Sequence, residues 1–147
     1  RVFRESKSSE GRFAMSLASC EAGLAIAQTK TTAVHSVSYP ITTHFHILHG
    51  HACALTLASF VRFNAVILKA QGYPMLKIFG VNDYESMAMK IEALMDGLDL
   101  EISLSKLGIQ EEGIELILRD GFRPDRIKNN PRHVGVEDLR VMLKSLG

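Results

Sequence analysis

The sequence predicts an all-α fold, and three observations support this. Apolar residues recur at spacings of three and four along most of the chain, which is the period of an amphipathic helix. No segment of strand length alternates apolar with polar residues. The 147 residues are 46% hydrophobic, which is enough to build one core at this length. We therefore expect a helical bundle of about six helices, forming a single domain over residues 1–147.

The first expected helix covers residues 10–28. Its apolar positions are Phe13, Leu17, Cys20 and Leu24, and four alanines lie beside them. Small residues let a second helix approach closely, so we expect this helix at the centre of the bundle.

The second expected helix runs from Ala33 towards Thr43, and the polar residues 30–32 supply its N-cap. Pro40 lies inside this segment. Because proline removes a backbone donor and clashes with the preceding turn, we expect a kink or a new start near Ser38.

The third expected helix, residues 50–68, is apolar on most of its circumference and should be buried. Residues 70–80 contain two glycines and a proline and are expected to form a connection. Three further helices are expected at 82–97, capped by Asn82, at 110–120 and at 136–146. Residues 121–135 are expected to form an irregular turn.

Composition excludes several classes of function. The net charge of +1 is too small for a dedicated nucleic-acid binder, so we expect no such partner. The longest apolar stretch, Ala52 to Val61, is too short to span a bilayer, and no signal peptide is visible. Cys20 and Cys53 lie in small, apolar surroundings and are expected to be reduced core residues. We therefore expect a cytoplasmic protein without a membrane segment.

Histidines are concentrated in one segment of the chain. Five of the six lie between residues 35 and 51, and the usual reason for such a cluster is a metal. His44, His46 and His51 flank the loop before the third helix and are expected to be exposed or to cap helices. His35 and His49 can face each other across a helix pair. Their separation of fourteen residues is not by itself diagnostic of a metal site.

The segment from Ala33 to Ile41, with His35 and Pro40, followed by His49-Gly50-His51-Ala52-Cys53, resembles the signature of the iron-dependent (group III) alcohol dehydrogenases. The resemblance covers nearly the whole chain. It continues in the alanine-rich first helix, Phe63-Asn64, the loop from Leu104 to Ile109, and Asn129-Asn130-Pro131-Arg132.

This resemblance implies the helical, metal-side C-terminal domain of a dehydroquinate synthase-like fold. It implies that His35 and His49 are ligands of a divalent metal, Fe or Zn, which polarises the oxygen of a small alcohol or aldehyde. NAD or NADP would bind to a nucleotide-binding domain that precedes this segment in the family and is absent here. The family's other two metal ligands, an Asp and a His, lie upstream as well. We therefore interpret the chain as a fragment that is inactive alone.

Two further residues take roles from the resemblance. Tyr39 stands where many relatives have a histidine near the nicotinamide, so it is a candidate catalytic and cofactor-binding residue; a core aromatic is the alternative. The triplet Lys30-Thr31-Thr32 resembles the corresponding segment in the branch of the family that reduces phosphonoacetaldehyde to hydroxyethylphosphonate. Lys30 is then a candidate substrate-binding residue, with a structural N-cap as the alternative.

Two functions remain open from the sequence. One is the oxidoreductase just described. The other is a non-catalytic helical module that uses its clustered histidines for metal binding or self-association. In either case the apolar surfaces of helices 10–28 and 50–68 lead us to expect a homo-oligomer.

Overall fold

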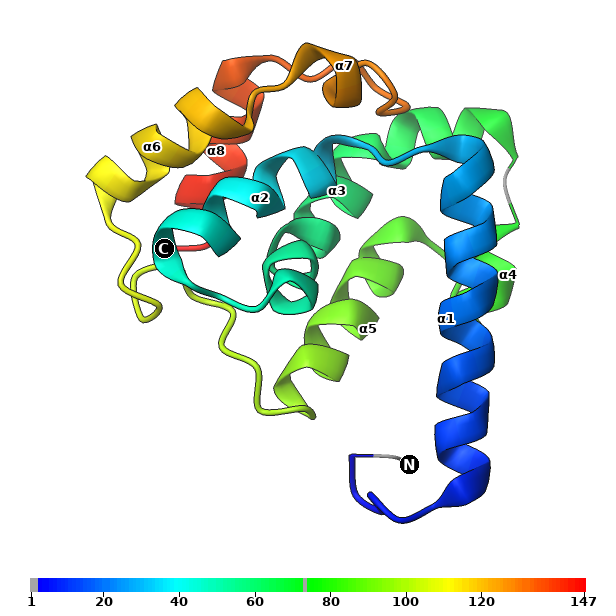
Figure 1. The fold of residues 1–147 in the computed structure, drawn as a ribbon. Helices are drawn as coiled ribbons and strands as arrows, with labels where there is room; N and C mark the ends of the chain where they lie inside the picture. Colours follow the sequence, from blue (N-terminus) through cyan, green and yellow to red (C-terminus); the bar gives the residue numbers. More distant parts are fainter. Residues whose placement is uncertain (1–2, 73) are drawn as a thin grey trace. The chain divides into compact units, whose positions relative to one another are not determined.

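The structure is a computed structural model that describes residues 3–72 and 74–147. The described residues form helices and loops without strands (Figure 1), which confirms the predicted all-α class. The chain divides into two compact units, Arg1–Thr31 and Thr32–Gly147. Each unit is described by itself, and the single domain over residues 1–147 stays a prediction.

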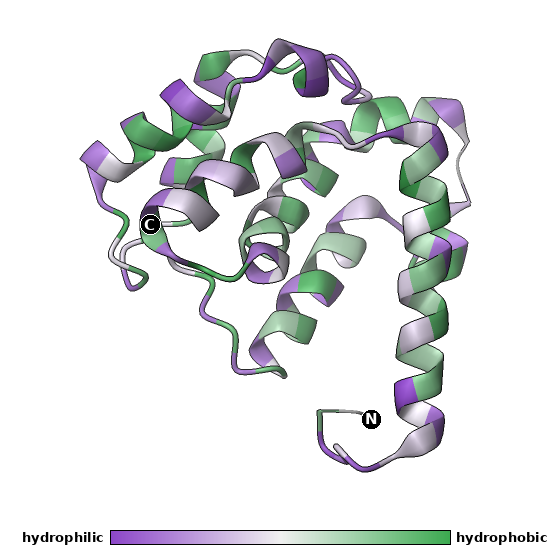
Figure 2. Cartoon of the chain, in the orientation of Figure 1, coloured by the Kyte–Doolittle hydropathy of each residue, from purple (hydrophilic) through white to green (hydrophobic). Residues whose placement is uncertain are grey.

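The first unit is built on α1 (Ser9–Thr29). Ser8 caps this helix, since its side chain accepts a hydrogen bond from the backbone N–H of Gly11. Apolar and small residues occur along most of the helix (Figure 2), and Phe13 is 72% exposed. Cys20 is also exposed, so its interpretation as a core residue is wrong: within its own unit α1 has no second layer to cover it. The central position expected for this helix stays a prediction.

The second unit contains the remaining helices: α2 (Ala33–Phe45), α3 (His49–Gln71), α4 (Met75–Phe79), α5 (Tyr84–Asp96), α6 (Glu111–Gly121), α7 (Pro124–Ile127) and α8 (Val136–Lys144). The long helix α3 packs against α2 on one side and α5 on another, and α2 also packs against α6 (Figure 1). One hydrophobic core lies among α2, α3, α6 and α8, and a second lies between α3 and α5.

Helix α2 is continuous through Pro40, so the expected new start near Ser38 is wrong. The proline leaves the carbonyl of Ser36 without its helical donor. The C-terminal end of α6 lies against this point: Ser36 Oγ donates to the carbonyl oxygen of Gly121 at 2.5 Å. A Cβ at Gly121 would meet Pro40 Cγ at 3.1 Å and Ser36 O at 3.3 Å. The close packing of α2 and α6 therefore depends on Gly121.

Helix α3 buries much of its circumference, as predicted, with Ala52, Leu55 and Phe60 in the core. By length and composition it is also the one described helix that could cross a membrane. A buried core helix meets the same criteria, so this observation is weak evidence for a membrane segment.

Some boundaries differ from those predicted. Two short helices, α4 and α7, lie in segments expected to be irregular, because single turns carry too few residues to show a period. The N-cap of α5 is Asp83 rather than Asn82: the Asp83 carboxylate accepts from the N–H of Ser86 at 2.7 Å.

A buried asparagine pair anchors the segment that follows α7. Asn64 on α3 and Asn130 exchange hydrogen bonds of 3.2 and 2.7 Å through their side-chain amides. Arg132 donates to the carbonyl of Phe63 and lies over its ring, 4.1 Å from the centroid. These are the Phe-Asn and Asn-Pro-Arg residues picked out in the sequence, and they hold the segment after α7 to α3.

Candidate metal centre

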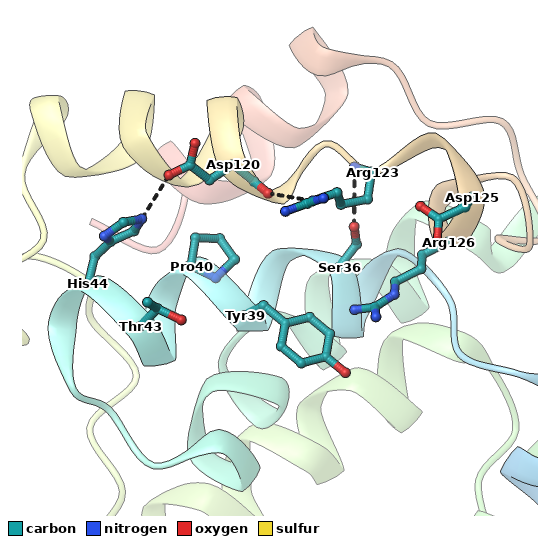
Figure 3. A pocket seen from close by; sticks show the side chains of 9 residues that line it. All are labelled: Ser36, Tyr39, Pro40, Thr43, His44, Asp120, Arg123, Asp125 and Arg126. Carbon is teal, nitrogen blue, oxygen red and sulfur yellow. Dashed lines mark hydrogen bonds and ion pairs between the residues drawn. The ribbon is translucent and has the colours of Figure 1, made fainter.

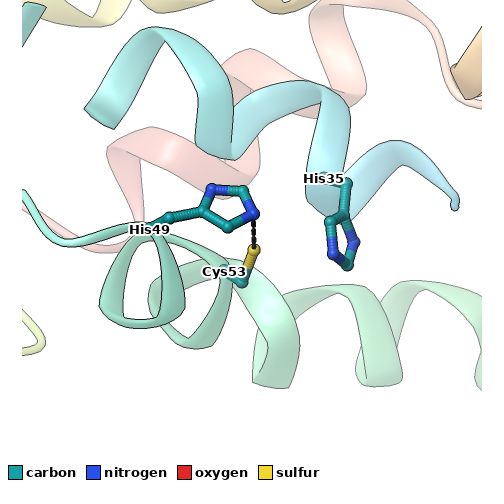
Figure 4. Close-up of side chains that lie close together, drawn as sticks. All are labelled: His35, His49 and Cys53. Carbon is teal, nitrogen blue, oxygen red and sulfur yellow. Dashed lines mark hydrogen bonds between the residues drawn. The ribbon is translucent and has the colours of Figure 1, made fainter. Parts of the chain in front are cut away.

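The paired histidines face each other where α2 packs against α3. His35 lies in the first turn of α2 and is half-buried, and His49 is the first residue of α3. Their ring centroids are 5.6 Å apart with an interplanar angle of 59°. Helix packing thus brings together the two side chains that the sequence singled out (Figure 4).

Cys53 adds a third donor beside the two imidazoles. It lies one turn after His49 on α3, and its Sγ is 3.7 Å from His49 Nε2 (Figure 4). One donor atom from each of His35, His49 and Cys53 lies within 4.8 Å of the other two. Ligand atoms around a tetrahedral zinc ion are separated by about 3.3 to 3.6 Å. The three side chains therefore fit a divalent cation with small adjustments of rotamer.

The surroundings shift the pKa of two of these side chains, and the two shifts have opposite effects on metal binding, since a metal binds neutral imidazole and thiolate. Burial lowers the pKa of His35, and the charges of His49 and Arg126 lower it further. A lowered pKa keeps this imidazole neutral, which is the form that binds a metal. Burial raises the pKa of the Cys53 thiol, and a hydrogen bond with Ser38 opposes that effect.

Tyr39 lies beside the histidines rather than in the core. Its ring centroid is 5.3 Å from that of His49, and the side chain is 42% exposed. The alternative of a core aromatic is therefore wrong. The Arg126 guanidinium, from α7, also lies over this ring, with Cζ 4.3 Å from the centroid.

The other clustered histidines lie around this centre without joining it. His46 is exposed and ends α2 in a left-handed conformation, as expected of a capping residue. His44 is exposed and its Nε2 lies 2.8 Å from Oδ2 of Asp120 on α6. His51 is half-buried, and its Nε2 lies 2.7 Å from the carbonyl oxygen of Glu101, so it anchors the loop after α5.

Lys30 belongs to the first unit, where it is the C-cap of α1 with φ 61°. The expected side-chain N-cap of α2 is not formed, since Thr32 makes no capping hydrogen bond with its side chain. The role of Lys30 in binding substrate stays a prediction.

Sequence reasoning missed two residues of the centre. Cys53 follows His49 by four residues on a helix, a spacing that places both side chains on one face and could have been noticed. Arg126 has no such signal, because its position beside Tyr39 depends on how residues 121–132 fold back over α2.

The chain is similar to several known proteins. The family model for the Fe-containing alcohol dehydrogenase family, C-terminal, matches residues 1–147. The phosphonoacetaldehyde reductase of Streptomyces viridochromogenes is 39% identical over 56 residues, and the NAD-dependent methanol dehydrogenase of Bacillus methanolicus is 25% identical over 144 residues. The crystal structure of sulfoacetaldehyde reductase from Bifidobacterium kashiwanohense in complex with NAD+ superposes with a TM-score of 0.72 at 32% identity.

The chain spans only part of each of these relatives. The matches cover 38% of the chain and 14% of the phosphonoacetaldehyde reductase, and 92% of the chain and 38% of the methanol dehydrogenase. The superposition covers 80% of the chain and 31% of the sulfoacetaldehyde reductase.

Proposed function

Since this chain belongs to the Fe-containing alcohol dehydrogenase family, we propose that it is the metal-side part of an NAD(P)-dependent alcohol dehydrogenase or aldehyde reductase. In the proposed reaction, the carbonyl carbon of an aldehyde gains a hydride from the reduced nicotinamide, and its oxygen gains a proton. The reverse reaction oxidises a small alcohol. The observation that carries the proposal is the convergence of His35 and His49 from two helices.

His35 and His49 are the proposed metal ligands of this chain. Their imidazoles lie on facing helices whose packing is fixed by the core, so the two donors are held in place before a cation arrives. A divalent cation, Fe or Zn, supplies Lewis-acid stabilisation of the negative charge that develops on the reacting oxygen. Neutral imidazole suits both metals.

We propose that Tyr39 contacts the nicotinamide of the cofactor. Its ring is exposed beside His49, which gives a flat surface and a hydroxyl next to the proposed reacting atoms. In this role the ring orients the nicotinamide, and the hydroxyl donates a hydrogen bond to it or to the substrate.

The substrate is proposed to be a small aldehyde, and phosphonoacetaldehyde is the specific candidate. The similarity to phosphonoacetaldehyde reductase supports this choice, and Lys30 is a proposed substrate-binding residue. We also propose that the protein is a homo-oligomer in the cytoplasm and has no nucleic-acid or membrane partner.

Metal content tests the ligand assignment. In the full enzyme that contains this chain, His35→Ala and His49→Ala each remove one ligand, and we expect bound metal and kcat/KM to fall by at least about 10- to 100-fold, the cost of losing even a supporting group. Elemental analysis and turnover with NADH or NADPH measure the two effects.

His46→Asn is the matched control, because asparagine tolerates the left-handed conformation at this position. It should keep normal metal content and turnover. A fully metallated and active His35→Ala enzyme would refute the ligand assignment. Metal binding that depends on both histidines, without turnover of any aldehyde, would favour a non-catalytic module.

A further inference from the structure

A recess in the surface adjoins the proposed metal centre at Tyr39. It has a volume of about 440 Å³ and lies between α2 and the segment from Asp120 to Arg126 (Figure 3). Its charged lining residues are Arg123, Arg126, Asp120 and Asp125, together with His44. Tyr39 also lines the recess, and its ring is next to that of His49. The recess therefore adjoins the paired histidines through Tyr39.

Arg126 differs from most other arginines of the second unit in lacking an acidic partner. Arg62 pairs with Glu85 and Glu92, Arg119 with Asp120, and Arg140 with Glu115 and Glu137. Among the described residues, no carboxylate pairs with Arg126. Its guanidinium instead lies over the Tyr39 ring, with Cζ 4.3 Å from the centroid. A stacked guanidinium keeps its edge N–H groups free for a bidentate oxyanion.

Arg123 adds a second cation without a carboxylate partner in the described chain. Its Nε donates only to the backbone oxygen of Asp120, at 3.4 Å (Figure 3). Two carboxylates, Asp120 and Asp125, also line the recess. Asp120 makes hydrogen bonds with His44 and Arg119, and Asp125 is exposed. Within the part of the chain that the structure describes, neither forms an ion pair with Arg123 or Arg126.

The position of Arg126 relates it directly to the proposed reaction. The Tyr39 ring lies near both groups: its centroid is 4.3 Å from Arg126 Cζ and 5.3 Å from the centroid of the His49 ring. The charge of Arg126 also acts at His35, whose pKa it helps to lower. A molecule whose carbonyl oxygen lay at the histidines could therefore reach Arg126 with its other end after only a few bonds.

We propose that Arg126, assisted by Arg123, binds the anionic end of the substrate, and that the substrate class is a short aldehyde bearing a tetrahedral oxyanion such as a phosphonate or sulfonate. This assignment rests on the proposed function for the aldehyde end. It places recognition of the anion on α7, in the same unit as the histidines, and makes Arg126 a determinant of specificity. Phosphonate and sulfonate share the three-oxygen geometry that a planar guanidinium grips through two N–H groups.

The kinetic test compares charged and neutral aldehydes in the full enzyme. Phosphonoacetaldehyde and sulfoacetaldehyde are the charged probes, and propanal is the neutral one. For Arg126→Gln we expect KM for the preferred charged aldehyde to rise by about 10- to 100-fold, the loss typical of a charge-assisted hydrogen-bond pair. Propanal carries no anion, so its KM should rise far less than that of the charged aldehyde, and its continued turnover shows that the variant is folded.

Two further variants sharpen this test. Arg126→Lys keeps the charge without the planar fork and should recover part of the loss. Arg140→Gln, on α8 and outside the recess, is the matched control and should leave the KM values for all three aldehydes unchanged. The relative KM values of the two charged probes show which oxyanion the site prefers. Equal losses for charged and neutral aldehydes in Arg126→Gln, or no preference of the parent enzyme for a charged aldehyde, would overturn the proposal.

A binding measurement separates this proposal from the proposed function. Titration calorimetry of the metal-free enzyme with ethylphosphonate and with ethanesulfonate needs neither metal nor nicotinamide. We expect one of these anions to bind, and the heat to disappear in Arg126→Gln but not in Arg140→Gln. If no aldehyde is turned over, this result still supports the anion site while the oxidoreductase proposal fails. Undetectable binding of both anions, or binding that survives Arg126→Gln, would refute the anion site.

Discussion

At the scale of single residues, Cys53 decides how many donors this chain can offer a metal. Its sulfur lies beside His49 Nε2, and both side chains project from one face of α3. Cobalt(II) bound by a thiolate shows intense near-ultraviolet charge-transfer absorption, which imidazole ligands do not produce. We expect the 147-residue chain titrated with cobalt(II) to show this band, and Cys53→Ser to abolish it while His35 and His49 still bind the ion. A parent chain that binds cobalt(II) without the band would show that Cys53 is not a ligand.

Asp120 predicts a pH dependence of stability. Hydrogen bonds from Arg119 and His44 lower the pKa of this carboxyl to about 2. A carboxylate with a lowered pKa stabilises the fold above its ordinary pKa of about 4 and loses that contribution as the pH falls towards about 2. Thermal unfolding of Asp120→Asn should therefore depend less on pH within this window than unfolding of the parent. Asp125→Asn, at a neighbouring exposed position, is the control, and an identical pH slope for Asp120→Asn and the parent would contradict the prediction.

The sequence identified the site residues that lie close together along the chain. His35 and His49 could be selected because histidines were concentrated in a segment that also matched a family signature. Arg126 could not, because its neighbour Tyr39 is far away in sequence and the two meet only through the packing of α7 over α2.

At the scale of elements, the contact of α2 with α6 positions both Tyr39 and the segment carrying Arg126. Gly121 permits that contact, because a Cβ there would lie 3.1 Å from Pro40 and 3.3 Å from Val37 Cα. We expect Gly121→Ala to lower the free energy of unfolding by about 1 to 3 kcal/mol, as overpacking does. Gly50→Ala on α3, where a Cβ meets nothing within 4 Å, is the matched control for urea unfolding. Equal stability of the two variants would show that α6 can move away without cost.

Helices with a clear apolar period could be predicted, and their inward faces mostly agree with the structure. Ile114, Ile117 and Leu118 of α6 follow the helical period and are buried. Leu94 of α5 follows the same period with Met87 and Ile91 but is 62% exposed, because the helix packs against α3 through a narrower face than its apolar residues suggest. Periodicity identifies apolar positions, but the partner helix determines which of them are covered.

At the scale of the whole molecule, the two helices expected to mediate self-association differ. Helix α3 places most of its apolar residues in the cores of the second unit, which leaves little surface for a partner. Helix α1 exposes five large apolar side chains: Phe13, Met15, Leu17, Leu24 and Ile26. The expectation of self-association therefore now rests on α1 alone.

The last prediction follows from that surface. Large apolar side chains exposed to water favour association, so we expect the 147-residue chain to associate in solution through α1. Replacing Leu17 and Leu24 together with Glu should reduce the mass measured by light scattering, because each charge would have to be buried in the contact. Ile78→Glu on α4, at a side chain that is 75% exposed in the second unit, should leave the mass unchanged. A parent chain that stays monomeric at high concentration would show that α1 does not bind a second copy.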